Sequence, residues 1–120
     1  MAARVILLNG PGSVGKTSVA RALQDCAAGP LLHLSMDGFC AMLPDRAWDD
    51  ADFFRFESRA DAIGPVTEVL TGPKGASLLA TMRRTVATLA QQGFDPVVDD
   101  VWLDGAPADY ASLLAGQRVW

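Results

Sequence analysis

Cysteine, basic charge and long hydrophobic runs are all scarce in this chain. Its two cysteines, Cys26 and Cys40, have a spacing that fits no metal site, and we expect free thiols in a reducing cytoplasm. Ten basic residues against fourteen acidic ones leave a net charge of −4, which argues against non-specific binding to nucleic acid or to an anionic membrane. The apolar run at residues 5–8 is far too short for a signal-peptide core or a membrane span. We therefore expect a soluble, cytoplasmic protein.

Histidine occurs once, as His33, and it falls inside a predicted strand rather than at its end. We therefore interpret His33 as a structural residue and not as a catalytic one. With 120 residues, half of them hydrophobic, the chain is long enough for one domain around one buried core. We expect residues 1–120 to form that single domain.

A glycine-rich stretch at residues 10–17, GPGSVGKT, is the most informative part of the sequence. It satisfies the phosphate-loop pattern G-x-x-x-x-G-K-[ST], and it lies between a strand-like run and a helix-like segment, as the mechanism of that loop requires. The alternative is a turn that merely joins a strand to a helix, and the context disfavours it. The predicted nucleotide-binding residues are Gly10, Pro11, Gly12, Ser13, Val14, Gly15, Lys16 and Thr17.

The residue types in this loop suit a polyphosphate ligand. Glycines allow the backbone to turn tightly and to approach a ligand, so that consecutive N–H groups point into one concavity and favour an anion. The helix that follows adds the positive end of its dipole. In this pattern Lys16 reaches the β- and γ-phosphates of ATP, and the Thr17 hydroxyl binds Mg²⁺. ATP and Mg²⁺ are therefore the expected ligands.

Hydrophobic patterning predicts strands at residues 4–9, 31–35 and 96–100, and the start of a fourth strand at 119–120. Helical spacing is found over 16–28, 76–92 and 107–114. Within the helices, we interpret Cys26 as a core residue and place Arg83 and Arg84 on a solvated face. Strand–helix–strand order predicts an α/β fold with a parallel sheet.

Residues 38–76 are the least regular part of the sequence. A short helix is expected over 38–43, and Val66–Leu70 is either a small strand or a loop between two Gly-Pro turns. We interpret Asp49, Asp50 and Asp52 as a solvated surface loop rather than as a metal site. A connection of this length is usually functional, and we expect it to bind the acceptor substrate.

Three aspartates follow predicted strands. Parallel strands end at one edge of a sheet, where ligands bind in open α/β folds, so Asp37 and Asp99 are expected beside the phosphate loop. Asp99, the first acid after an apolar run, is the candidate Mg²⁺ ligand, either directly or through water. Asp100 either faces the substrate or caps the following turn. A structural alternative for Asp37 is the N-cap of the helix that follows.

These features together resemble the chloramphenicol phosphotransferase-like small-molecule kinases. The resemblance runs through ILLNGPGSVGKT, the strand leading to Asp37, the turn at residues 63–65, the helix before Gly93, and VVDDVWL, and it covers nearly all of the chain. It implies a three-layer P-loop NTPase fold of the nucleotide-kinase type. It also implies transfer of the γ-phosphoryl group of ATP to a hydroxyl of an antibiotic, with Lys16 on the phosphates and Asp37 as the base that accepts the hydroxyl proton.

Members of that family continue well beyond the length of this chain. We therefore expect an incomplete C-terminal end, without most of the fourth strand, the arginine-bearing lid over the phosphates, and a fifth strand. An open edge beside the phosphate-loop strand would favour self-association.

The sequence thus predicts an ATP-dependent kinase that acts on a hydroxyl of a small molecule, with chloramphenicol as the substrate that the family names. The alternative is a truncated nucleotide-binding protein without turnover. An NTPase that only hydrolyses nucleotide ranks last, because no glutamine or glutamate stands beside Asp99 to position water. No motif identifies the acceptor.

Overall fold

The computed structural model describes residues 3–10, 15–61, 64–101 and 106–120, with only the backbone described for 56–61, 64–69 and 106. Four strands form a fully parallel sheet in the order β2-β5-β1-β6. All four strands lie where the hydrophobic patterning predicts them: β1 Arg4–Asn9, β2 Leu31–Ser35, β5 Asp95–Asp100 and β6 Arg118–Val119. The predicted parallel sheet is confirmed.

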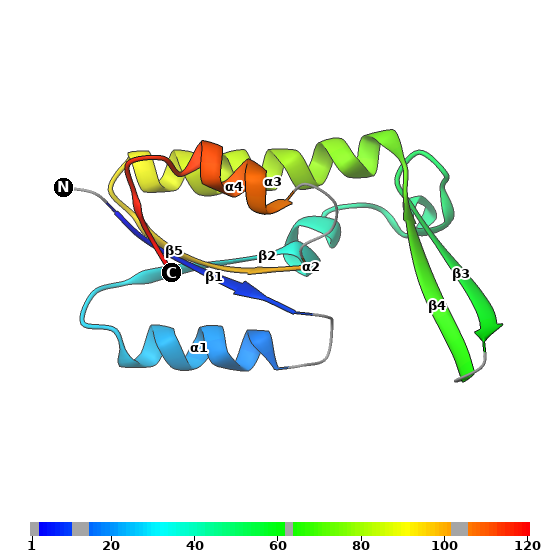
Figure 1. Cartoon of the computed structure of the whole chain (residues 1–120), viewed down its shortest axis with the longest axis horizontal. Coiled ribbons are helices and arrows are strands. Elements are labelled where there is room, and N and C mark those ends of the chain that lie inside the picture. The colour runs from blue at the N-terminus through cyan, green and yellow to red at the C-terminus, as the bar shows by residue number, and fades with distance from the viewer. Residues whose placement is uncertain (1–2, 11–14, 62–63, 102–105) are drawn as a thin grey trace.

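Helices cover both faces of this sheet, so the fold has three layers (Figure 1). On one face lies α1 (Lys16–Cys26), and on the other lie α3 (Pro73–Gln91) and α4 (Ala106–Leu113). The short helix α2 (Met36–Cys40) follows β2 directly, at the carboxyl end of the sheet. Within the described ranges, no helix combines the length and the hydrophobicity needed to cross a bilayer.

The main hydrophobic core lies between the sheet and the layer of α3 and α4. Val5 of β1 and Val98 of β5 are completely buried there, against Val86 and Ala90 of α3. Removing apolar surface from water stabilises a fold by roughly 25 cal/mol per Å². This core therefore holds β1 and β5, the two strands that lead into the candidate site described below.

The opposite face is covered less completely. Among the residues of α1, only Ala20 is buried. Val19 is 48% exposed and Cys26 is also exposed, so the interpretation of Cys26 as a core residue is wrong. The physical reason is that α1 packs on β1, β2 and β5 through one side, on which Ala20 is its only buried residue, and Cys26 at the last position of the helix remains exposed.

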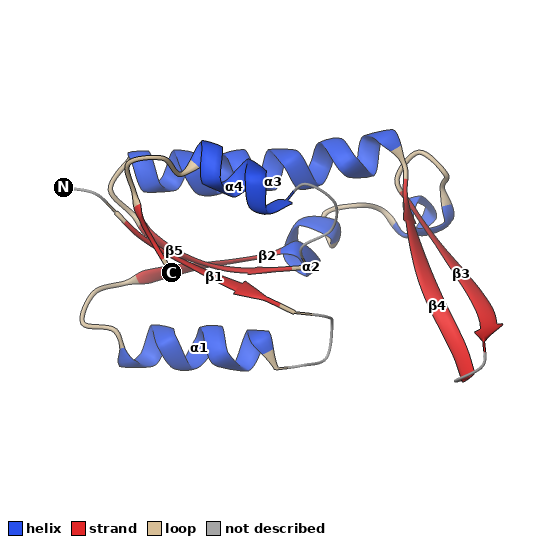
Figure 2. Ribbon diagram, viewed as in Figure 1, coloured by secondary structure: helices blue, strands red, loops and turns tan. Residues whose placement is uncertain are grey.

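An antiparallel hairpin projects from the body of the molecule (Figure 2). It consists of β3 (Phe54–Asp61) and β4 (Gly64–Thr71), which pair along their whole length outside the parallel sheet. Of the two alternatives left open for Val66–Leu70, the structure has the strand, but the preceding strand was not predicted. The turn predicted at residues 64–65 is wrong in position, because these residues already belong to β4. The short helix η1 (Asp45–Asp49) leads towards the hairpin, and the acidic residues of this segment are exposed, as predicted.

Backbone hydrogen bonds join the two ends of the hairpin where α3 begins. The N–H of Gly72 donates to the carbonyl of Phe53 at 2.8 Å, and the N–H of Lys74 donates to the carbonyl of Asp52 at the same distance. The crossing chain comes so close that a Cβ atom at position 72 would lie 2.0 Å from the carbonyl oxygen of Ala51. Only glycine fits at this position without moving the backbone.

Candidate functional site

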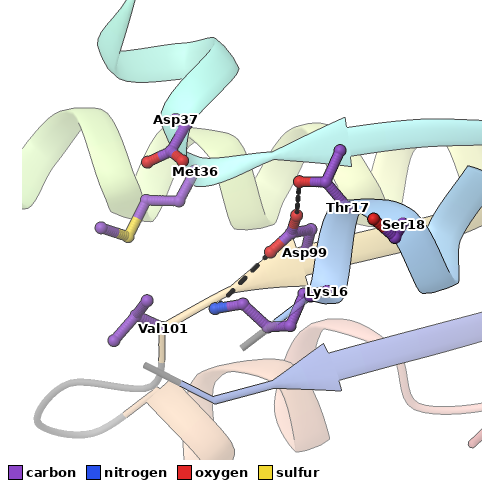
Figure 3. Close-up of a pocket in the computed structure, with 8 residues that line it drawn as sticks. Lys16, Thr17, Ser18, Met36, Asp37, Asp99 and Val101 are labelled. Atoms are coloured by element: carbon purple, nitrogen blue, oxygen red, sulfur yellow. Dashed lines mark hydrogen bonds and ion pairs between the residues drawn. The ribbon is translucent and has the colours of Figure 1, made fainter. Parts of the chain in front are cut away.

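A pocket of about 210 Å³ opens at the carboxyl ends of the parallel strands, where α1 begins (Figure 3). Four residues predicted from the sequence, Lys16, Thr17, Asp37 and Asp99, meet in its wall. The described residues that line it are Gly15, Lys16, Thr17, Ser18, Met36, Asp37, Asp99 and Val101. Three lining residues were not predicted, although each lies next to a candidate residue in the sequence: Ser18, Met36 and Val101.

The loop before α1 lies only partly within the described residues. Gly10 follows β1, whereas Pro11, Gly12, Ser13 and Val14 lie outside the described residues and their part in the site stays a prediction. Gly15 is the N-cap of α1 and has a left-handed backbone with φ of 89°, which glycine adopts without strain. Because Gly15 has no side chain to bond to the first-turn amides, these remain available to an anion at the positive end of the helix dipole.

The side chain of Asp99 lies between the first two residues of α1. The Thr17 hydroxyl donates to Oδ2 of Asp99 at 2.9 Å, and the Lys16 ammonium lies 3.6 Å from Oδ1 (Figure 3). The side chains of Lys16 and Asp99 are only about a tenth exposed, at 11% and 10%. Lys16 also donates to the carbonyls of Gly10 and, at 3.2 Å, of Asp100. The lysine is thus held at the ends of β1 and β5 in a shielded position.

The donor atoms in this pocket fit a magnesium ion. Mg²⁺ prefers oxygen ligands, and it usually takes one or two from the protein and the rest from water and phosphate. Thr17 and Asp99 supply a hydroxyl and a carboxylate side by side. Among the described residues there is no cluster of three or more histidine, cysteine or acidic side chains that could enclose a metal ion. An ion here would therefore share its coordination with a bound phosphate.

His33, predicted to be structural, lies close to this site. Its Nε2 atom is 3.9 Å from Oδ2 of Asp99, which is too long for a hydrogen bond, and it is buried without a hydrogen-bond partner among the described residues. The strand register could have revealed this proximity. His33 pairs with Val97, and Asp99 lies two residues further along on the same face.

Asp37 enters the pocket from α2, on the side away from Lys16 (Figure 3). The alternative role of Asp37 as an N-cap is wrong, because Ser35 occupies that position and its hydroxyl accepts the N–H of Gly38 at 2.9 Å. Asp37 itself is exposed in the first turn of α2. Its carboxylate is therefore accessible to a molecule in the pocket.

Asp100 points to the opposite face of the sheet, so the prediction that it faces the substrate is wrong. The turn that follows it lies largely outside the described residues, and a role in capping that turn stays a prediction. The side chain of Asp100 is 1% exposed and accepts the Tyr110 hydroxyl at 2.7 Å and Nε of Arg83 at 3.4 Å. Arg83 is also buried, 3.5 Å from Asp109, and its placement on a solvated face is wrong. A buried carboxylate needs a positive partner, and Arg83 supplies it. Arg84 is exposed, as predicted.

The environment of Tyr110 keeps its hydroxyl protonated. Burial raises the pKa of Tyr110 far above its usual value, and both the hydrogen bond to Asp100 and the negative charge of that residue raise it further. The positive charge of Arg83 opposes this shift but is too weak to reverse it. Tyr110 is therefore a permanent hydrogen-bond donor to Asp100 in the folded chain.

Comparison with known proteins agrees with the architecture of the fold. Two curated relatives, from the CDC 1551 / Oshkosh and ATCC 25618 / H37Rv strains of Mycobacterium tuberculosis, both carry the name "Putative O-phosphotransferase". Each is 34% identical over 125 residues, an alignment that covers 98% of this chain and 55% of the relative. The chain thus spans just over half the length of these relatives. Residues 3–120 match the family described as chloramphenicol phosphotransferase-like protein. The chain belongs to this family, and its fold is the P-loop kinase-like fold of that family.

Proposed function

We propose that this chain forms the phosphate-binding part of an ATP-dependent phosphotransferase that acts on a hydroxyl of a small molecule. The observation that carries the proposal is the meeting of Lys16, Thr17 and Asp99 at the start of α1, with Asp37 across the same pocket. The names of the relatives support the transfer of a phosphoryl group to oxygen.

Each residue has a distinct task in the proposed reaction. The acceptor hydroxyl attacks the γ-phosphorus of ATP, the bond from that phosphorus to the bridging oxygen breaks, and ADP leaves. Asp37 accepts the hydroxyl proton, because it is the accessible carboxylate in the pocket that is not paired with Thr17 or Lys16. Lys16 offsets negative charge on the phosphates.

Thr17 and Asp99 would hold Mg²⁺, which would supply positive charge to offset the charge that develops on the phosphates during transfer. Both groups are oxygen donors in contact with one another, and this fits the preference of that ion. Chloramphenicol is the first acceptor to test, since the family carries its name. We also propose that the protein acts in the cytoplasm. Its ligands are a nucleotide and a small molecule, and nucleic acid has no role.

The test is a comparison of three chains incubated with Mg·ATP and chloramphenicol. Mass spectrometry of the acceptor should find the gain of one phosphate with the native chain. The gain should disappear with Asp37→Asn, while the affinity for Mg·ATP stays near the native value. Lys16→Ala is the matched control for binding, and it should lose both transfer and affinity.

Two outcomes would contradict parts of this proposal. Full activity of Asp37→Asn would show that another group accepts the proton. Tight binding of Mg·ATP by the native chain, with no transfer to any hydroxyl compound, would favour the alternative of a nucleotide-binding protein without turnover.

A further inference from the structure

The last residues of β5 are held from both faces of the sheet. On the side of α1, Asp99 contacts Thr17 and Lys16. On the side of α3 and α4, the carboxylate of Asp100 is held by Arg83 and Tyr110. Successive side chains of a strand point to opposite faces, so one short piece of backbone carries both sets of contacts.

The main chain of Asp100 links the two sets directly. Its carbonyl oxygen accepts a hydrogen bond from the Lys16 ammonium at 3.2 Å, while its side chain is anchored on the other face. A shift of the Asp100 backbone, which the side-chain contacts oppose, would therefore move an oxygen atom that holds Lys16. The same shift would turn the preceding residue, Asp99, away from the Thr17 hydroxyl.

The anchor on the far face is buried and uses one carboxylate oxygen. Oδ2 of Asp100 accepts both bonds, and Oδ1 is buried without a hydrogen-bond partner among the described residues. Asp100 is 1% exposed, and in so shielded a place its hydrogen bonds and its ion pair are weakened little by water. Arg83 is fixed in turn, because its guanidinium also lies 3.5 Å from Asp109 and 5.7 Å from the centre of the Tyr110 ring. The ring of Tyr110 is packed in the main hydrophobic core, so the hydroxyl that donates a hydrogen bond to Asp100 has little freedom to move.

We propose that Arg83 and Tyr110 are positioning residues for the phosphate site. By holding the carboxylate of Asp100, they fix the carbonyl that receives Lys16 and the direction in which Asp99 faces Thr17. Neither residue touches the pocket, whose described lining contains neither of them. The inference rests on the proposed function insofar as it concerns nucleotide affinity, and its test is designed to separate the two.

The first measurement is the affinity for Mg·ADP, by titration calorimetry, in three variants of the 120-residue chain. Arg83→Met should weaken binding by roughly 10-fold, a factor that corresponds to about 1.4 kcal/mol, because it releases the carboxylate of Asp100, the residue next to the candidate metal ligand Asp99. Tyr110→Phe removes one hydroxyl and keeps the buried ring, and it should weaken binding in the same direction. Arg84→Met is the matched control, since it removes an exposed arginine at the next position of α3 and should bind as the native chain does.

The second measurement needs no nucleotide. The chain has two lysines, Lys16 in the pocket and Lys74, which is 66% exposed at the start of α3. Limited labelling with an amine-reactive reagent, followed by mass spectrometry of the peptides, gives the labelling rate of Lys16 relative to Lys74. Arg83→Met and Tyr110→Phe should raise this ratio, because they release the carbonyl that holds Lys16, whereas Arg84→Met should leave it unchanged.

These two readouts distinguish a positioning role from a merely structural one. A purely structural role would lower the melting temperature of the Arg83 and Tyr110 variants and leave both the Mg·ADP affinity and the labelling ratio at native values, and that result would overturn the inference. If Arg83→Met does not fold, Tyr110→Phe decides alone. If the native chain does not bind Mg·ADP, the proposed function fails, and the labelling ratio still supports or refutes the positioning role.

Discussion

Tyr110 is the single tyrosine of the chain, so its ionisation can be followed without interference from another phenol. It is 2% exposed, and its hydroxyl donates to Asp100 at 2.7 Å. Removing the proton would break this bond and leave two negative charges at hydrogen-bond distance in a shielded place. Burial first, and then Asp100, therefore raise the pKa of Tyr110 well above its usual value. We predict that the folded chain shows no tyrosine ionisation through the range in which a free tyrosine titrates.

The stability of the fold should depend on this group at alkaline pH. A tyrosine in an unfolded chain has a pKa of about 10. The pKa of Tyr110 in the folded chain is higher. The contribution of Tyr110 to the free energy of unfolding is therefore fully present below about pH 10, the pKa of the unfolded chain, and is lost as the pH rises towards the pKa of the folded chain. The loss is about 1.4 kcal/mol per pH unit, because one proton separates the two states. The free energy of unfolding of a typical domain is roughly 5–15 kcal/mol, so the loss over two pH units is a large fraction of it.

The assay combines phenolate absorbance with circular dichroism over a rising pH series. In the native chain, the absorbance change should appear only together with unfolding, whereas in concentrated urea it should appear at about pH 10. Tyr110→Phe is the control, and it should remove both the absorbance change and this part of the alkaline loss of stability. A native chain whose phenol titrates reversibly at about pH 10, while the circular dichroism stays that of the folded state, would refute the reasoning.

The remaining predictions concern the metal ligand and the thiols. Thr17→Val removes the hydroxyl that donates to Asp99, so nucleotide affinity in the presence of Mg²⁺ should fall by about 10-fold while Thr17→Ser retains it. Calorimetry with and without Mg²⁺ checks this, and an equal loss in both conditions would argue against a metal role. Cys26 is exposed and should react with a thiol reagent in the native state, whereas Cys40 is 3% exposed, and burial raises the pKa of its thiol, with a further rise from nearby negative charge. Mass spectrometry should therefore count one adduct before unfolding and two after it, and two adducts on the native chain would contradict the burial of Cys40.

Much of the fold was predictable because the parallel strands and the long helices have strong local patterns. The hairpin was not fully predicted, although Phe54 and Phe56 alternate with Arg55 and Glu57 as a strand requires. Two features concealed it. The acidic loop before it dominates the local composition, and the turn between the strands carries none of the Asn-Gly or Asp-Gly pairs that identify a tight hairpin.

In the candidate site, too, residues that a local sequence pattern identifies were predicted, whereas residues that depend on distant partners were not. Lys16, Thr17, Asp37 and Asp99 could be named because a motif or a strand end identifies each of them, and the structure brings them to one pocket. The burial of Arg83 could not be deduced from its charge. Its spacing from Leu79 and Val86 puts it on the apolar face of α3, but only the fold reveals the carboxylate of Asp100 that makes burial tolerable.

The close crossing at Gly72 decides which parts of this protein can vary independently. The hydrogen bond between Gly72 and Phe53 holds the two ends of the hairpin next to each other. The hairpin therefore leaves the body of the molecule and returns to it at one place, which we call its base. Beyond that base, we expect hairpins of other lengths and sequences to be tolerated, provided that Phe54 keeps its packing against Cys40 and Leu79. If residues 54–71 help to select the acceptor, substrate range can diverge in this one replaceable module while the machinery for phosphate stays the same.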